Sequence, residues 1–406
     1  MAAFRRVRAR TLALAAPLSA EDACVQSMPD ASPAKWHLAH TSWFFERFIL
    51  ATRVAGYRPC HERYDYLFNS YYYSVGQMHL RPRRGLITRP SRDEILAYRA
   101  HVDAALARLL EDAGDDGELD FLVTLGIHHE QQHQELLLTD IKHLFAQNPL
   151  LPAYAELPRT GTGEVTPLRW LQGSPGIAEI GHAGEAFAFD NETPRHCALL
   201  GEHALASRLV TNAEFREFID DGGYADSALW LSDGWSTVMA EGWQRPLYWH
   251  EDLEQEFTLG GLQPIQPDAP VAHLSYFEAD AFARWAGCRL PTEFEWEAAA
   301  ARLPVDGNFA DSGALHPRPA TGGAGLEQVY GDAWEWTASP YSPYPGFRPL
   351  AGSLGEYNGK FMCSQMVLRG GSCATPVGHV RPTYRNFFYP GQRWQFSGVR
   401  LARDRA

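Results

Sequence analysis

Three long stretches in the first 150 residues repeat apolar positions at the spacing of an α-helix. The stretch at 32–50 opens with Ser-Pro, which favours a helix start because serine caps helices and proline suits the first helical position. The stretch at 91–112 opens with acidic residues, which the helix dipole favours in the first turn, and a third covers 119–145. We therefore predict that residues 1–150 form a helical bundle.

The pattern changes after Pro149. Glycine, proline and tryptophan become frequent, and short β-type runs alternate with Gly-, Asn- and Asp-containing turns. One clear helix is predicted near 275–286, and a shorter one follows Thr292. We predict an α+β protein in which residues 160–406 form a second domain, joined by a linker at about 149–159.

The N-terminus imitates a secretory signal, because four arginines precede the apolar and small residues 12–20. The apolar run is short and Pro17 interrupts it. A first amphipathic helix with an arginine face is the alternative that we favour.

The amino-acid composition and the net charge exclude several classes of protein. The chain has 406 residues, of which 45% are hydrophobic and 21% charged, as in globular proteins. The net charge of −13 argues against a general nucleic-acid binder, and no apolar run approaches the ~20 residues of a membrane helix. Six scattered cysteines without a CxxC pair fit reduced thiols in the cytoplasm.

A histidine motif lies inside the third predicted helix. His129 and His133 are four residues apart, so both side chains lie on one helix face and can bind one metal ion. With Glu130 the letters also fit HExxH, in which the glutamate is the general base of a zinc protease. The alternative is a pair of structural histidines.

A third ligand would favour a metal site, and His37 or His40 on the first long helix can supply it in a bundle. Zn²⁺ or Fe²⁺ would suit three imidazoles.

The loop between the first two long helices carries two further candidates. Tyr71 and Tyr72 can donate a proton near an oxidising metal, although aromatic packing is the commoner role. Arginines at 81, 83 and 84 can bind a substrate carboxylate, although a solvated basic patch is the commoner case.

The C-terminal half contains several dense motifs. These are Arg289–Trp296, Gly331–Trp336, Leu368–Ser372, Tyr384–Phe387 and Gly398–Leu401. Together they resemble the formylglycine-generating, sulfatase-modifying domain, which has a C-type-lectin-like fold, over about residues 165–403. That family carries a cysteine pair after its Gly-Gly-Ser motif, whereas here Cys373 has no second cysteine near it. We infer that the fold is reused for another reaction.

The N-terminal half resembles a DinB-like metal-binding bundle. Its fusion to a sulfatase-modifying domain is similar to the hercynine oxygenases, the sulfoxide synthases of ergothioneine biosynthesis. The resemblance runs from about Arg8 through Trp36–His40, Phe68–Tyr72 and His129–His133 to Tyr384–Phe387, which excludes the secretory signal. It implies a mononuclear non-haem Fe(II) bound by His40, His129 and His133, with hercynine, a thiol and O2 as substrates.

The resemblance also implies roles for residues around the metal. Gln132 and Asn386 match contacts to the hercynine head group, and Phe387 would face its trimethylammonium in a cation–π arrangement. Tyr71 or Tyr72 would supply a proton. Arg81 and Arg84 lie where the cysteine-using branch holds the cysteine carboxylate.

One position bears on the sulfur donor. Members that use γ-glutamylcysteine have an acidic residue where this chain has Phe388. With the tyrosine pair, this favours free cysteine. The alternatives are a γ-glutamylcysteine-using homologue, a selenoneine synthase that takes a selenosugar, a relative acting on histidine itself, a DinB-type zinc thiol transferase, and a lectin-like binding module without catalysis.

Overall fold

The chain forms two units, which a computed structural model describes for residues 1–158 and 166–404. Unit 1 comprises Met1–Leu150 together with Glu185–Phe187 and Pro349–Tyr357. Unit 2 comprises Leu151–Gly184, Ala188–Arg348 and Asn358–Ala406. Because two short segments of the later sequence belong to unit 1, the division into domains 1–150 and 160–406 stays a prediction.

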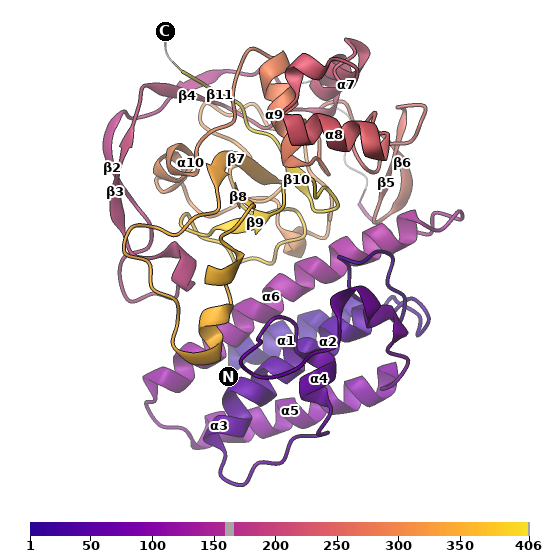
Figure 1. The fold of residues 1–406 in the computed structure, drawn as a ribbon, viewed down its shortest axis with the longest axis vertical. Coiled ribbons are helices and arrows are strands. Elements are labelled where there is room, and N and C mark those ends of the chain that lie inside the picture. The colour runs from indigo at the N-terminus through magenta and orange to yellow at the C-terminus, as the bar shows by residue number, and fades with distance from the viewer. Residues whose placement is uncertain (159–165, 405–406) are drawn as a thin grey trace. The chain divides into compact units, whose positions relative to one another are not determined.

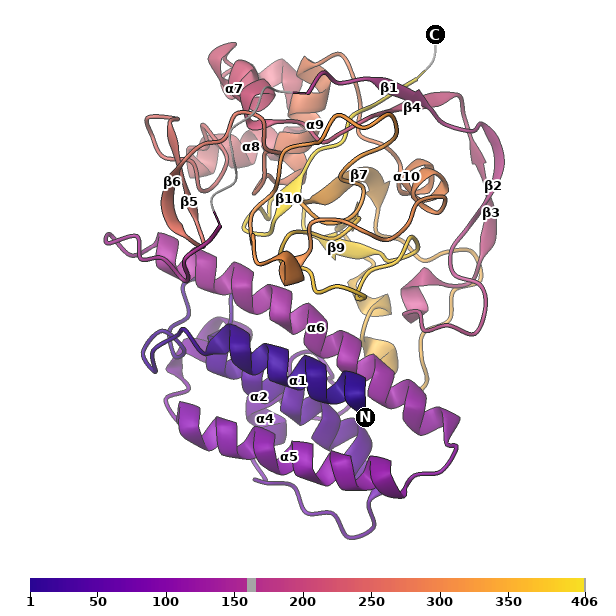
Figure 2. The same cartoon turned by 180° about the vertical axis from the view of Figure 1, so that it is seen from behind.

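Unit 1 is a helical bundle (Figure 1). Its α2 packs against α5 and α6, and α1 lies beside α6 (Figure 2). The three predicted long helices are confirmed. The helices of unit 1 are α1 Ala2–Ala15, α2 Ala34–Phe45, the π-helix η1 Glu46–Leu50, α3 Ala51–Arg53, α4 Tyr64–Phe68, the 3-10 helix η2 Arg81–Leu86, α5 Arg92–Asp112, α6 Gly117–Ala146 and the 3-10 helix η6 Gly352–Glu356.

Local signals explain where these helices begin. Ser91 and Glu94 form a capping box at the start of α5, and the Asp116 carboxylate accepts the backbone N–H groups of Glu118 and Leu119 at the start of α6. Every residue of α2 is buried, so this helix forms the centre of the bundle.

The predicted N-terminal helix is confirmed, but its arginine face is only partly correct. Arg5 and Arg6 are exposed, whereas Arg8 is buried and forms ion pairs with Asp103 and Glu130. A buried arginine in this position is stable because both carboxylates offset the loss of its hydration.

Unit 2 combines short strands with short helices. A four-stranded sheet, ordered β10-β7-β8-β9, lies within it (Figure 1), and α10 packs against β7 and β8. A three-stranded sheet, β1-β4-β11, and the pairs β2-β3 and β5-β6 complete the strands among the described residues. The strands are β1 Trp170–Gln172, β2 Gly176–Ile180, β3 His196–Leu200, β4 His203–Ala206, β5 Gln255–Thr258, β6 Gly261–Pro264, β7 Trp334–Pro340, β8 Met366–Arg369, β9 Asn386–Phe388, β10 Ser397–Gly398 and β11 Ala402–Asp404.

The predicted helices near 275–286 and after Thr292 are confirmed, but two more are present. The helices of unit 2 are α7 Asn212–Asp220, α8 Ser232–Glu241, α9 Tyr276–Trp285, α10 Glu293–Ala300 and the 3-10 helices η3 Asp190–Glu192, η4 Ser227–Leu229, η5 Ala310–Ser312 and η7 Gly359–Phe361. The sequence pattern did not predict α7 and α8. In α8, Gly234 weakens helix propensity, yet its missing side chain makes room for the Phe277 ring. Among the described residues, no helix is long and apolar enough to cross a membrane.

Candidate metal centre

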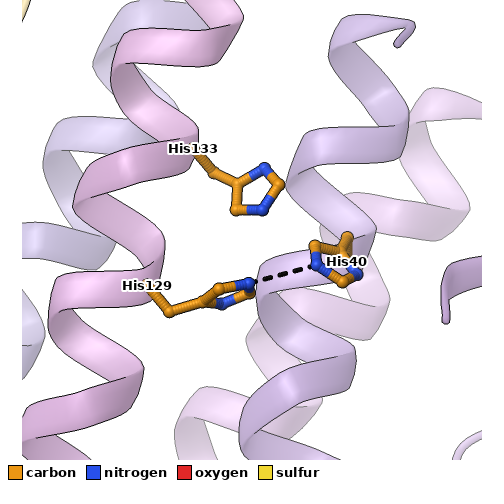
Figure 3. A group of neighbouring side chains, drawn as sticks. All are labelled: His40, His129 and His133. Carbon is orange, nitrogen blue, oxygen red and sulfur yellow. Dashed lines mark hydrogen bonds between the residues drawn. The ribbon is translucent and has the colours of Figure 1, made fainter. Parts of the chain in front are cut away.

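Three histidines of unit 1 converge in the bundle interior. Figure 3 shows His129 and His133 projecting from α6 towards His40 on α2. One ring nitrogen of each lies within 4.8 Å of the others, and the Nε2 atoms of His40 and His129 are 3.1 Å apart. The three predicted ligands therefore come together, and His40 rather than His37 completes the group.

The electrostatics of this group suit a cation. Burial lowers the pKa of His129 to about 3 and lowers the pKa values of His40 and His133 well below the usual range, so all three rings are neutral. His40 donates its Nδ1–H to the carbonyl of Phe68 at 2.5 Å, which leaves the Nε2 lone pair facing His129. Converging neutral imidazole lone pairs are the donor set of a metal ion, so these residues fit one.

The HExxH interpretation is wrong for this chain, because the Glu130 carboxylate binds buried side chains of the bundle and is not available as a general base. Its carboxylate accepts hydrogen bonds from Arg8 at 2.9 Å, Arg99 at 2.8 Å and Thr11 at 2.6 Å. Burial alone would raise the pKa of Glu130, but the two arginines lower it to about 2. A carboxylate held in this way cannot act as a general base at neutral pH.

The predicted tyrosine pair lies in the loop that follows α4. Tyr72 is completely buried, and its ring packs against Trp43 and Phe48 and lies 4.6 Å from that of Tyr71. Burial raises the pKa values of both hydroxyl groups, so both remain protonated at neutral pH. Aromatic packing and proton donation are compatible for this pair.

A third tyrosine, Tyr357, lies near the histidines and was not predicted from the sequence. Its ring centroid lies 5.8 Å from that of His129 and 6.2 Å from that of Tyr71, and its hydroxyl donates to Oε1 of Gln132. Tyr357 is 225 positions from Gln132, and no motif surrounds it. Only the inclusion of Pro349–Tyr357 in unit 1 brings it to the site.

The two predicted carboxylate-binding arginines differ. Arg81 is exposed and donates to the backbone carbonyl of Asp30. Arg84 is buried, and its guanidinium carbon lies 3.4 Å from the Trp36 ring centroid. It donates to the hydroxyl groups of Ser32 and Ser70. Within the described residues Arg84 has no ionic partner, and burial lowers its pKa well below the usual range. Such a site favours an incoming anion.

The three remaining predicted residues form β9 in unit 2. Asn386, Phe387 and Phe388 pair with β8, and Phe387 stacks on Tyr341 with the ring centroids 4.1 Å apart. The ring centroid of Phe388 lies 6.4 Å from that of Trp394. Their contacts with hercynine stay a prediction.

Comparisons with known proteins agree with this two-part organisation. Residues 3–137 match the DinB superfamily, and residues 171–321 and 313–405 match the sulfatase-modifying factor enzyme 1-like domain. The fold class predicted from the sequence is thereby confirmed.

Two hercynine oxygenases match nearly the whole chain, and a third relative matches about half of it. The hercynine oxygenase of Mycobacterium tuberculosis is 36% identical over 98% of this chain and 97% of its own length. The hercynine oxygenase of Mycolicibacterium smegmatis is 36% identical over 93% and 92% respectively. A formylglycine-generating enzyme of Streptomyces coelicolor is 30% identical over 54% of this chain and 82% of its own length.

Proposed function

The chain belongs to the hercynine oxygenase family, and from this premise we propose that it joins hercynine to cysteine in an iron(II)- and O2-dependent reaction of ergothioneine biosynthesis. The single observation that carries the proposal within the structure is the buried group of three neutral histidines. A lectin-like binding module would have no need of such a group.

The reaction balances with O2 as the only oxidant. Hercynine loses the hydrogen of one ring carbon, and cysteine loses its thiol hydrogen as the C–S bond forms. One oxygen atom of O2 enters the sulfoxide, and the other leaves as water with the two hydrogens. Bond formation and sulfoxidation each give up two electrons, which together reduce O2.

His40, His129 and His133 would hold the iron through neutral nitrogens. A bound iron(II) would supply the redox capacity for O2 and the coordination positions that collect both substrates. Because the three rings are buried, water would be excluded from the side of the iron that the histidines bind.

Other side chains would position the substrates and supply a proton. Gln132 accepts a hydrogen bond from the Tyr357 hydroxyl at its Oε1, and its amide nitrogen would donate to the hercynine carboxylate. Tyr71 and Tyr72 keep their protons at neutral pH because burial raises both pKa values, so either can act as the acid. Arg84, which has no ionic partner in the described part of the chain, would bind the cysteine carboxylate, with Arg81 nearer the solvent.

The test is product mass after incubation of the Fe(II)-loaded protein with hercynine and cysteine in air. We expect hercynylcysteine sulfoxide, with one oxygen atom derived from ¹⁸O2. The product should be absent without O2 and absent in His129→Ala. His101→Ala, which removes an exposed histidine on α5, is the matched control and should retain activity.

Each alternative predicts a different result. Product with γ-glutamylcysteine or a selenosugar, but not with cysteine, would overturn the proposed donor and leave the oxygenase assignment in place. Thiol transfer by the Zn²⁺-loaded protein without O2 would instead identify a DinB-type transferase.

A further inference from the structure

A chain of hydrogen bonds leads from His133 away from the candidate metal centre. Nδ1 of His133 lies 2.9 Å from Nδ1 of His37, and Nε2 of His37 lies 3.0 Å from Oδ2 of Asp140. All three side chains are buried. None of the roles described above uses His37 or Asp140.

Helix periodicity accounts for this meeting. His37 precedes His40 by three residues on α2, so the two lie on the same face of that helix. Asp140 follows His133 by seven residues, two turns further along the same face of α6. The helix faces that supply the three ligands therefore also supply a histidine and a carboxylate behind one of them.

The protons along this chain can be assigned from donor and acceptor counts. Oδ2 of Asp140 also accepts the backbone N–H of Ser32 at 2.8 Å, so this oxygen acts as an acceptor. The nitrogen of His37 that faces it, Nε2, must then carry a proton. A neutral His37 has its lone pair on Nδ1, so the proton between the two Nδ1 atoms belongs to His133.

This assignment determines which atom of His133 can bind a metal. With its proton on Nδ1, His133 presents an Nε2 lone pair to the group formed with His40 and His129. The opposite tautomer would point an N–H bond at the position that the metal needs.

We propose that His37 and Asp140 are positioning residues that fix the Nδ1–H tautomer of His133 and thereby select Nε2 as its metal-binding atom. The inference rests on the metal centre of the proposed function. Support comes from a contrast among the ligands: His40 is fixed by the Phe68 carbonyl, whereas Nδ1 of His129 has no hydrogen-bond partner in the described residues. Only His133 is oriented by a chain that ends in a carboxylate.

The direct test is long-range ¹⁵N–¹H NMR of the full-length protein with ¹⁵N-labelled histidine, with the His133 signals assigned by their loss in His133→Ala. In the metal-free and Zn²⁺-loaded wild-type protein, we expect the His133 proton on Nδ1. In metal-free His37→Phe, the signals should move towards the Nε2–H tautomer. A merely structural role of His37 would not move them, and a wild-type His133 protonated on Nε2 would overturn the proposal.

The second measurement is Zn²⁺ and Co²⁺ affinity by competition with a chelator. Loss of a residue that orients a metal ligand typically weakens binding ~10–100-fold, so we expect a loss of this size in His37→Phe and a smaller loss in Asp140→Asn, whose amide oxygen still accepts a hydrogen bond. Asp120→Asn, an exposed acid-to-amide change on α6, is the matched control and should bind as the wild type does.

The two measurements separate failure of this inference from failure of the proposed function. Unchanged metal affinity in His133→Ala would show that these histidines do not form the metal site, and would overturn the proposed function as well. Loss of metal in His133→Ala, with wild-type affinity in folded His37→Phe and Asp140→Asn, would overturn only the positioning role. If His37→Phe fails to fold, the wild-type tautomer and Asp140→Asn still decide the question.

Discussion

Arg84 is a buried arginine whose hydrogen-bond partners in the described residues are hydroxyl groups, so it is suited to bind an anionic ligand. Its guanidinium donates to Ser32 Oγ at 2.9 Å and Ser70 Oγ at 3.0 Å, and both partners are uncharged. A charge-assisted hydrogen bond contributes about 1.5–3 kcal/mol, so Arg84→Lys, which lacks the planar fork, should raise the KM for cysteine ~10–100-fold. The KM for hercynine should change by less than about twofold.

Steady-state kinetics with each substrate varied in turn checks this prediction. Arg83→Lys changes an exposed neighbour and should have no effect on either KM. A larger effect from Arg81→Lys, or equal changes in both KM values, would contradict the assignment to Arg84.

The three buried histidines also predict how the metal-free protein responds to acid. Each is neutral in the folded state, and the pKa of His129 is lowered to about 3, whereas the unfolded chain binds a proton near pH 6.5. Stability is therefore independent of these groups above pH 6.5. It falls as pH drops below 6.5, by about 1.4 kcal/mol per histidine for each pH unit.

Urea unfolding of chelator-treated protein at pH 7.5 and 5.5 measures this loss. His129→Ala removes one titrating group, so its loss between the two pH values should be smaller by about 1.4 kcal/mol. An equal loss in the variant and the wild type would show that His129 is already charged or exposed in the folded state.

The sequence predicted the residues whose positions follow from local spacing. His129 and His133 share a helix face because they are four residues apart, and the resemblance chose His40 over His37. Proton positions depend on tertiary contacts that no local pattern contains. The contact of Tyr357 with Gln132 and the burial of Arg84 were unpredictable for the same reason.

At the scale of elements, prediction followed the strength of the local signal. The acidic first turn and the apolar periodicity sustained over residues 91–112 predicted α5 correctly, and the structure adds a capping box of Ser91 and Glu94 at its start. The short α7 also has a capping box, formed by Thr211 and Glu214, but its apolar face consists of little more than Phe215 and Phe218. Two turns give too few periodic positions to separate a helix from the surrounding irregular chain.

Glu130 of α6 is linked to α1 through Arg8 and to α5 through Arg99. Its two ion pairs, with Arg8 and Arg99, are fully buried. Removing one partner of a buried pair leaves uncompensated charge, so Glu130→Gln should lower the free energy of unfolding by about 3 kcal/mol or more. Glu118→Gln, at an exposed ion pair on the same helix, should cost less than about 1 kcal/mol.

Urea unfolding at neutral pH distinguishes this structural role from a catalytic one. If Glu130 were a general base, Glu130→Gln would abolish turnover with little loss of stability. We expect the reverse order of effects: a clear loss of stability, with residual turnover in the fraction that stays folded.

At the scale of the whole molecule, the surroundings of the candidate metal centre combine segments from distant parts of the chain. Pro349–Tyr357 belongs to unit 1, although it follows most of unit 2 in the sequence. The Glu356 carboxylate accepts the backbone N–H groups of Tyr73 and Ser74, each at 2.9 Å, and the Ser74 hydroxyl. This contact holds the segment against the loop that carries Tyr71 and Tyr72.

The same contact predicts a substrate-specific effect. Glu356→Gln removes the charge that two backbone N–H groups and a hydroxyl share, so the next residue, Tyr357, should hold Gln132 less firmly. Because hydrogen bonds to a charged group contribute about 1.5–3 kcal/mol, we expect the KM for hercynine to rise ~10-fold or more.

Metal affinity should not change, because none of the three histidines contacts Glu356 through a hydrogen bond in the described residues. Glu241→Gln, an exposed change in unit 2, is the matched control. A loss of metal in Glu356→Gln, or an unchanged KM, would mean that this segment does not position Gln132 for its substrate.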